Sequence, residues 1–228
     1  RGGPAASLKA RVEERTGLHT SLESYDWIVF LPMPDGFGAY NRYYGCLSTG
    51  EIKVRGIMAR RGDTPPYIRT MQESILSVMS RAGSRTELEG LEERARGIYR
   101  DAESGLPDAP PSSMAIRRQV SRLTYSHRCP EASAVAACRA AGIGVEPGME
   151  IGYVVTDART WSVELDWVAR RFDLGYYRRL LWKAWEEIAF APLQMGLGQA
   201  EVAERVGVGG AGLAGGAGDA GGHCRAAS

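Results

Sequence analysis

The pattern of apolar and polar residues in the N-terminal part of the chain predicts one short helix followed by strands. Apolar residues at helical spacing, with a glycine after them, predict an amphipathic helix over 8–16. The run 25–31 is rich in aromatic and β-branched residues and predicts a strand, and the prolines and glycines of 32–38 predict a loop. Two extended runs, 42–47 and 51–56, flank Ser-Thr-Gly and therefore predict a hairpin.

Helical periodicity then dominates the middle of the chain. Asp63 ahead of two prolines predicts a capped helix start, and apolar residues from Ile68 to Met79 recur at helical spacing. Ser84 and Glu87 have the spacing of a capping box and predict a second helix. The apolar stripe of that second helix consists of Leu88, Leu91, Ala95, Ile98 and Tyr99.

The rest of the chain mixes a linker, two helices and a strand. Three prolines in 105–113 predict a linker, and the basic segment 114–125 has no clear period. A small-residue helix is expected over 130–141, and a strand over 148–155. Asp173 is expected to cap a last helix that runs to about residue 190. We expect Trp161, Trp167, Trp182 and Trp185 to pack the last strand and helix.

Composition bounds the class of protein. The chain has 228 residues, of which 44% are hydrophobic and 24% charged, with a formal net charge of +1. These values are typical of globular domains and argue against a collagen, a coiled coil or global disorder. No apolar run approaches the length of about 18 residues that spans a membrane. The four cysteines form no C-x-x-C pair, which favours reduced thiols over a zinc site or a disulfide framework.

The small net charge conceals a segregated pattern. The segment 109–130 contains no acidic residue, and the segment 40–62 contains five basic residues against one acid. The first segment carries Arg117, Arg118, Arg122, His127 and Arg128, and the second carries Arg42, Lys53, Arg55, Arg60 and Arg61. Two basic clusters in a neutral protein indicate a local surface for a polyanion, and a solvated charged face is the alternative.

Four motifs follow one another along the chain. They are Asp35–Gly45 (DGFGAYNRYYG), Ile57–Pro65 (IMARRGDTP), Ala115–Tyr125 (AIRRQVSRLTY), and Pro147–Val155 (PGMEIGYVV) ahead of a Tyr176-Tyr177 helix. In this order they resemble archaeal family B DNA polymerases, over roughly residues 8–190. The motifs match the region after the second catalytic carboxylate motif, the turn entering the thumb, the thumb segment along the primer, and the thumb's final strand and helix.

This resemblance implies an α+β fold in which a short antiparallel piece of the palm sheet precedes a mainly helical thumb. The boundaries that we expect are 1–62 for the C-terminal part of the palm, 63–192 for the thumb and 193–228 for a disordered glycine-rich tail. The tail is expected to be disordered because of its glycine-rich composition.

The resemblance places Asn41-Arg42-Tyr43 at the family's lysine-x-tyrosine position. There the lysine reaches the minor-groove edge of the primer and the tyrosine helps to hold the primer backbone. Minor-groove acceptors are similar for all base pairs, so a donor there checks pair geometry rather than sequence. Asn41 can donate but is shorter than lysine and uncharged. The alternative is a hairpin whose Tyr43 packs on the palm.

Two further constellations are expected to contact DNA phosphates. Arg60 and Arg61 can each fork onto phosphate oxygens, while Asp63 orients a guanidinium or caps the next helix. The second constellation combines arginine, hydroxyl and tyrosine donors, which position a duplex without reading its sequence. Its expected DNA contacts are Arg118, Ser121, Arg122, Tyr125 and Arg128.

The resemblance also implies what is supplied elsewhere. In this family the catalytic carboxylates, the fingers and the exonuclease lie upstream of the motifs found here. Nucleotide transfer needs two metal ions, so Mg²⁺ is expected in the complete enzyme, with no catalytic residue and no cofactor on this portion. We therefore expect a DNA-directed DNA polymerase portion that grips the primer–template duplex during replication, in the cytoplasm at the nucleoid, and has no activity alone.

Several histories and one other class remain open. The upstream polymerase portion is expected as a separate chain or as a missing segment, so the chain is the small subunit of a split polymerase, a fragment or an inactivated relative. Alternatively the chain is a non-catalytic module, derived from a polymerase, that binds duplex DNA or docks on a partner. Trp27, Phe30 and Leu31 are candidates for an apolar docking patch.

Overall fold

A computed structural model describes residues 4–32 and 38–194, so most of the expected 32–38 loop and most of the glycine-rich tail lie outside the described residues. The elements are, in order, α1 (Pro4–Thr16), β1 (Tyr25–Pro32), β2 (Gly38–Leu47), β3 (Ile52–Arg55), the 3₁₀ helix η1 (Met58–Arg60), α2 (Pro66–Met79), α3 (Arg85–Gly90), α4 (Glu92–Gly105), the 3₁₀ helices η2 (Leu106–Asp108) and η3 (Pro111–Met114), β4 (Ile116–Gln119), α5 (Pro130–Ala140), β5 (Glu150–Asp157), β6 (Ser162–Leu165) and α6 (Leu174–Gln194). The expected α+β class is confirmed.

The first sheet consists of β1, β2 and β3 in antiparallel order, as the sequence predicts. Tyr44 lies at the middle of the central strand, opposite Val29 on β1 and Val54 on β3. The Tyr44 ring is fully buried, and its hydroxyl donates a hydrogen bond of 2.7 Å to the carbonyl oxygen of Ile188 on α6. The last helix therefore closes the face of the first sheet.

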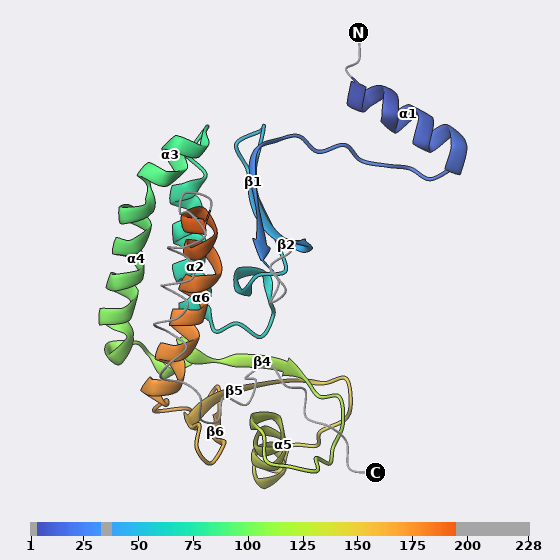
Figure 1. The fold of residues 1–228 in the computed structure, drawn as a ribbon. Coiled ribbons are helices and arrows are strands. Elements are labelled where there is room, and N and C mark those ends of the chain that lie inside the picture. Colours follow the sequence, from blue (N-terminus) through green and yellow to red (C-terminus); the bar gives the residue numbers. More distant parts are fainter. Residues whose placement is uncertain (1–3, 33–37, 195–228) are drawn as a thin grey trace.

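Helices α2, α4 and α6 run side by side, with the first sheet beside them (Figure 1). The capping box is confirmed, because Ser84 Oγ accepts from the Glu87 backbone N–H. The helix expected after it breaks at Leu91 into α3 and α4. Asp173 caps α6, since its Oδ1 accepts from the Tyr176 N–H at 2.9 Å.

A second antiparallel sheet, β4-β5-β6, packs with α5 below the first sheet in Figure 1. The sequence predicts β5 but neither β4 nor β6. β4 forms inside the basic segment that has no hydrophobic period, by pairing Ile116 with Tyr153 and Gln119 with Glu150. The pairing partners are distant in sequence, so local pattern carries little signal for this strand.

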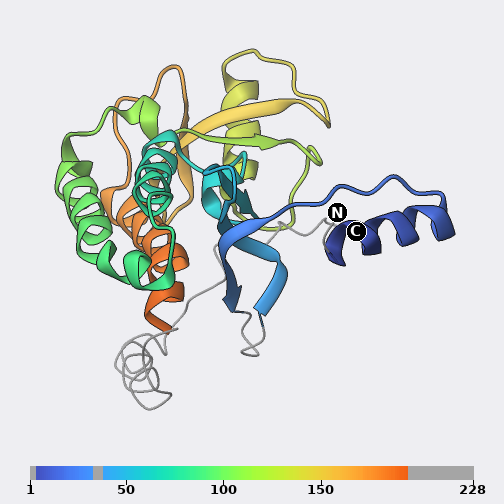
Figure 2. The ribbon, with the colours of Figure 1, turned by 90° about the horizontal axis from the view of Figure 1, so that it is seen from above.

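One hydrophobic core runs from the first sheet through the helices to the second sheet. Helix α1 stands away from this body, on the side of the first sheet opposite the helices (Figure 2). Free, buried thiols are found at Cys46 and Cys138.

Two predictions about clusters of aromatic residues differ from the structure, one as a whole and one in part. The docking patch does not form, because Leu31 is buried and the half-buried Trp27 donates its indole N–H to the Ala82 carbonyl at 2.7 Å, which leaves Phe30 exposed. The packing expected for the tryptophans fails at the exposed Trp167, whereas Trp161 packs on Tyr176 and the partly exposed Trp182 and the buried Trp185 pack on Tyr99.

Candidate nucleic-acid interface

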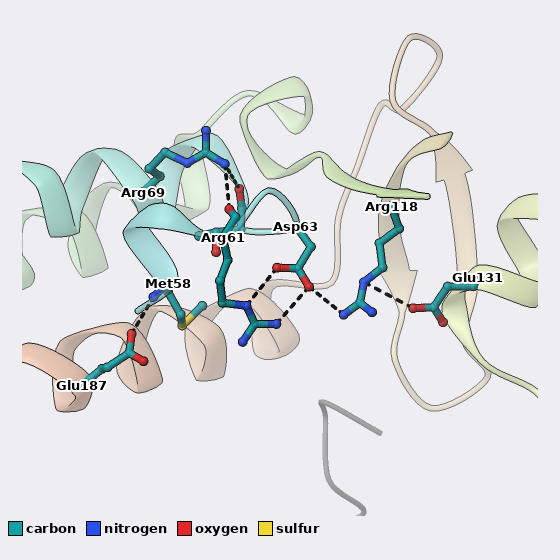
Figure 3. Close-up of polar contacts among 8 residues, drawn as sticks. Met58, Arg61, Asp63, Arg69, Arg118, Glu131 and Glu187 are labelled. Carbon is teal, nitrogen blue, oxygen red and sulfur yellow. Dashed lines mark hydrogen bonds and ion pairs between the residues drawn. The ribbon is translucent and has the colours of Figure 1, made fainter. Parts of the chain in front are cut away.

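Asp63 joins two of the segments that are expected to contact DNA. Its carboxylate binds Arg61 in a fork, with Nε–Oδ1 at 3.0 Å and Nη2–Oδ2 at 2.9 Å. The same Oδ2 lies 2.7 Å from Nη2 of Arg118 on β4, and Arg118 Nε lies 3.5 Å from Glu131 Oε1 on α5 (Figure 3). Arginines and acids therefore alternate in one line from the start of α2 to α5.

The electrostatics of this line favour the charged forms. Partial burial raises the pKa of Asp63, but the hydrogen bond from Arg61 and the charges of Arg61 and Arg118 outweigh burial and leave that pKa below its usual value. The hydrogen bond to Asp63 in turn raises the pKa of Arg61. Half of the Arg61 side chain remains exposed, against about a quarter for Arg118.

The loop ahead of α2 is held by a further arginine. Arg69 Nη2 donates to the carbonyl oxygens of Arg61 at 3.0 Å and Thr64 at 3.3 Å (Figure 3). The capping role expected for Asp63 is wrong, because the N-cap of α2 is Pro65 and no side chain caps it. Asp63 instead uses its oxygens for the two arginines, and Pro66 needs no capping acceptor because it has no N–H.

Consecutive arginines in the 57–65 motif point to different surroundings. Arg61 turns towards Asp63, whereas Arg60 lines an open groove of about 1030 Å³ beside β3 and α2. The charged residues of that groove are Glu23, Glu51, Lys53, Arg55, Arg60 and Glu73. Lys53 pairs with Glu23, so the groove is mixed in charge rather than basic.

The 41–43 motif lies near the N-terminal end of the described part of β2. Asn41 is exposed, and Tyr43 is half-buried between the rings of Tyr25 and Phe30, with centroids at 6.4 and 5.6 Å. Arg42 donates through Nη2 to Glu187 Oε1 on α6 at 2.8 Å and through Nε to the Gly56 carbonyl at 3.4 Å.

Gly56 holds this end of the hairpin close to β2. Its φ is +64°, and a Cβ there would lie 2.5 Å from the Asn41 carbonyl oxygen and 2.9 Å from Cγ of Arg42. Only glycine fits both the left-handed backbone and the close approach. The chain therefore turns from β3 into η1 directly against the Asn41-Arg42 segment.

The remaining expected contacts lie in the loop between β4 and α5. Ser121 and Arg128 are exposed, and Arg122 and Tyr125 are half-buried. Burial raises the pKa of Tyr125, Glu131 adds to the rise and Arg122 opposes it, which places both charges near its hydroxyl. In the described residues, no ion pair involves Arg60, Arg122 or Arg128.

Sequence reasoning missed the acids that hold these arginines. Glu187 and Glu131 are each distant in sequence from their partners Arg42 and Arg118. One signal for Glu187 exists, because it follows buried Ala184 by three positions on α6 and therefore lies at the edge of the helix's buried stripe. For Glu131 the local pattern indicates no such partner.

No cluster of three or more His, Cys, Asp or Glu side chains in the described ranges is placed to hold a metal ion. None of the described helices is long and apolar enough to cross a membrane.

Comparison with known proteins yields a sequence likeness to a curated protein and fold likenesses to solved structures. The chain is 31% identical over 147 residues to DNA polymerase 2 of Aeropyrum pernix, a match that takes in 64% of this chain and 17% of that protein. Its fold is similar to that of the family B DNA polymerase from the hyperthermophilic archaeon Pyrobaculum calidifontis, with a TM-score of 0.57 and 20% identity over 83% of this chain and 25% of that one. No family model matches the chain.

The sequence likeness and the shared fold together define a polymerase-derived chain. Both likenesses support the prediction made from the motifs, that the chain corresponds to a portion of a family B DNA polymerase. The chain spans about a sixth of the curated relative and a quarter of the solved polymerase chain.

Proposed function

We propose that this chain is the portion of a family B DNA polymerase that grips the primer–template duplex, and that the bond-forming chemistry belongs to an upstream portion. One observation carries the proposal: Arg61 and Arg118, from two separate segments that the motifs assign to DNA contact, meet on the single carboxylate of Asp63. A shared anchor gives the two segments a common geometry, which a clamp on a regular backbone needs.

The first set of direct phosphate contacts in this proposal comes from cations that have no acidic partner in the described part of the chain, and it adds to the contacts of paired arginines such as Arg42 and Arg61. Arg60, Arg122 and Arg128 meet that condition, and Ser121 and Tyr125 add hydroxyl donors beside them. Such contacts are independent of base sequence and therefore suit a protein that must move along any template.

Arg61 and Arg118 take different parts. The exposed half of the Arg61 guanidinium has donors left for a phosphate while Asp63 fixes its plane. Arg118 lies between Asp63 and Glu131 and mainly ties β4 to α5 and to the start of α2. About a quarter of its side chain remains exposed.

The hairpin contributes the contact near the primer end. Exposed Asn41 donates to the minor-groove edge of the last base pair. Tyr43 helps to hold the primer backbone, and its ring is oriented by packing against Tyr25 and Phe30. Asparagine carries no charge, so this contact adds less affinity than a lysine would.

Catalysis in the proposal requires an upstream palm with fingers and exonuclease, in a separate chain or segment, and Mg²⁺ bound there. The described residues offer no metal-binding cluster, and the proposal assigns none to them. This chain supplies the grip and has no polymerase activity alone.

The direct test is binding of a fluorescent primer–template duplex to the purified chain over a series of salt concentrations. We expect log K to fall linearly with log salt, and a variant with Arg60, Arg122 and Arg128 changed to Gln to lose most of that slope. The matched control changes Arg81, Arg94 and Arg178, three exposed arginines without an ion pair among the described residues, and should keep the slope. Equal slopes in the two triple variants would sink the proposed grip.

A second experiment tests the missing chemistry. The chain is mixed with an upstream polymerase portion, and primer extension with Mg²⁺ is measured for the mixture and for each part alone. Extension in the mixture only supports a split enzyme. A stable complex without extension favours an inactivated relative, and extension by this chain alone contradicts the proposal.

A partner-docking module is the second candidate, and the exposed apolar residues Leu8, Val12, Leu18 and Leu22 on and after α1 favour it. A docking module would bind duplex weakly and with little dependence on salt. The salt series therefore separates the two candidates.

A further inference from the structure

We infer that Glu187 is a positioning residue for the duplex grip, which holds the guanidinium of Arg42 in a fixed orientation beside Asn41 and Tyr43. This inference rests on the proposed duplex-binding function. No motif in the sequence assigns a role to Glu187.

The Glu187 carboxylate is bound from three elements. Its Oε1 accepts from Arg42 Nη2 of β2 at 2.8 Å, and its Oε2 accepts from the Met58 backbone N–H of η1 at 2.8 Å and from Gln72 Nε2 of α2 at 3.2 Å. Figure 3 shows the contact with Met58. Both oxygens have donors, and the side chain is 11% exposed. The carboxylate therefore has little freedom to turn.

The donors themselves are fixed. Gln72 is fully buried and also donates to the Ala184 carbonyl at 2.7 Å, so it is tied to the same helix as Glu187. The Met58 N–H belongs to the backbone at the start of η1. A carboxylate held by a backbone N–H and a buried amide is a rigid acceptor for a third group.

Arg42 is the most exposed side chain of this group. Its side chain is 39% exposed, and only Nη2 and Nε have partners within the described ranges, so Nη1 remains for another acceptor. Without Glu187, the Arg42 side chain would sample several rotamers, and it would lose that conformational entropy when it binds a phosphate. Because Glu187 already orders the side chain in the free protein, binding loses less entropy.

A charge pair that served stability alone would be a poor choice here. Desolvation of a largely buried carboxylate offsets much of its attraction to an arginine, and apolar residues often stabilise such sites as well or better. The arrangement instead orients the partly exposed guanidinium of Arg42, and an ordered contact with a duplex requires such an orientation.

The test compares Glu187→Gln with Glu186→Gln, a change at the exposed neighbouring glutamate of α6. Affinity for the primer–template duplex is measured at one salt concentration, with circular dichroism to confirm the fold. We expect Glu187→Gln to weaken binding about tenfold, as for loss of one phosphate-directed arginine, and Glu186→Gln to leave binding unchanged. If Glu187→Gln does not fold, Glu187→Asp, which keeps the charge on a shorter side chain, takes its place.

The same substitution in an Arg42→Gln background shows whether the effect passes through Arg42. We expect Arg42→Gln alone to weaken binding about as much, and the double variant to be little weaker than either single one. Additive losses, or unchanged affinity in Glu187→Gln, would overturn the inference. Failure of the unmodified chain to bind duplex overturns the proposed function itself, and the positioning role with it, so the two failures are distinguishable.

Discussion

Asp63 Oδ2 lies 2.7 Å from Arg118 Nη2, and this contact ties the loop that starts α2 to the first strand of the second sheet. The same oxygen also receives Arg61 at 2.9 Å. One carboxylate thus bridges two guanidinium groups, so protonation of that carboxylate leaves two cations close together.

We predict that Asp63 makes the fold sensitive to acid. Its pKa in the folded protein lies below the value of about 3.9 found in unfolded chains, so its stabilising contribution is complete above that value and is lost as the pH falls through the folded-state pKa. Asp63→Asn should lower the free energy of unfolding at pH 7 by about 1–3 kcal/mol and should flatten its decline below about pH 4. Urea denaturation at pH 7, 5 and 3.5 measures both effects. Asp101→Asn, at an exposed position of α4, is the control, and an equal acid response in the two variants would contradict the prediction.

A second prediction concerns the close approach at Gly56. Gly56→Ala should destabilise the protein by more than Gly50→Ala, although both glycines have positive φ, +64° and +83°. At Gly50 a Cβ meets nothing within 4 Å, so the cost is backbone strain of about 1 kcal/mol. At Gly56 the Cβ would also collide with the Asn41 carbonyl. Equal unfolding free energies for the two variants, measured by urea titration, would contradict the prediction, because they would show that β2 moves away from the added Cβ without loss of stability.

The third prediction concerns the buried hydroxyl of Tyr44. Tyr44→Phe removes the hydrogen bond to the Ile188 carbonyl and leaves that acceptor without its buried donor, at a cost of about 1–2 kcal/mol. Thermal unfolding followed by circular dichroism measures the loss. Tyr125→Phe is the comparison, because the half-buried Tyr125 should lose little stability while duplex affinity falls. The reverse pattern would reject the role given to each tyrosine.

The fourth prediction separates a phosphate contact from a base contact. Arg122→Gln should weaken binding to duplexes of different sequence by the same factor and should lower the salt slope by about one. Arg94→Gln on α4 should change neither quantity. Fluorescence anisotropy with two unrelated duplexes provides the measurement, and a loss confined to one sequence would show base readout instead.

Local signals accounted for much of the fold. The Ser-Thr-Gly turn between β2 and β3, the capping box at Ser84 and the cap at Asp173 depend on contacts within a few residues, and each appears where the sequence predicts it. β4 was missed because its partner β5 is distant in sequence, whereas β6 pairs with the preceding strand β5 and was missed because it has only 4 residues. The break at Leu91 was missed because the apolar stripe continues through it.

The candidate site was predictable in its residue types but not in its connections. The arginines of the two basic segments stand out as charge clusters, whereas nothing local pairs Arg42 with Glu187 or Arg118 with Glu131. Asp63 is an example, because a polar residue before prolines is a common helix cap. In the folded protein its carboxylate instead binds Arg61 and Arg118. Whether these residues contact DNA stays a prediction.

The contact between Tyr44 and Ile188 spans 144 residues of sequence. A ribosome that adds about 5–20 residues per second makes the helix that covers Tyr44 roughly 7–30 s after Tyr44 itself. Through that interval Val29, Leu31 and Tyr44 have no cover from α6, and the edges of the new hairpin are open to other strands. Synthesis of this chain therefore includes a period in which the first sheet lacks its helical cover, and we expect its yield in cells to follow the rate of translation through the segment that encodes α6.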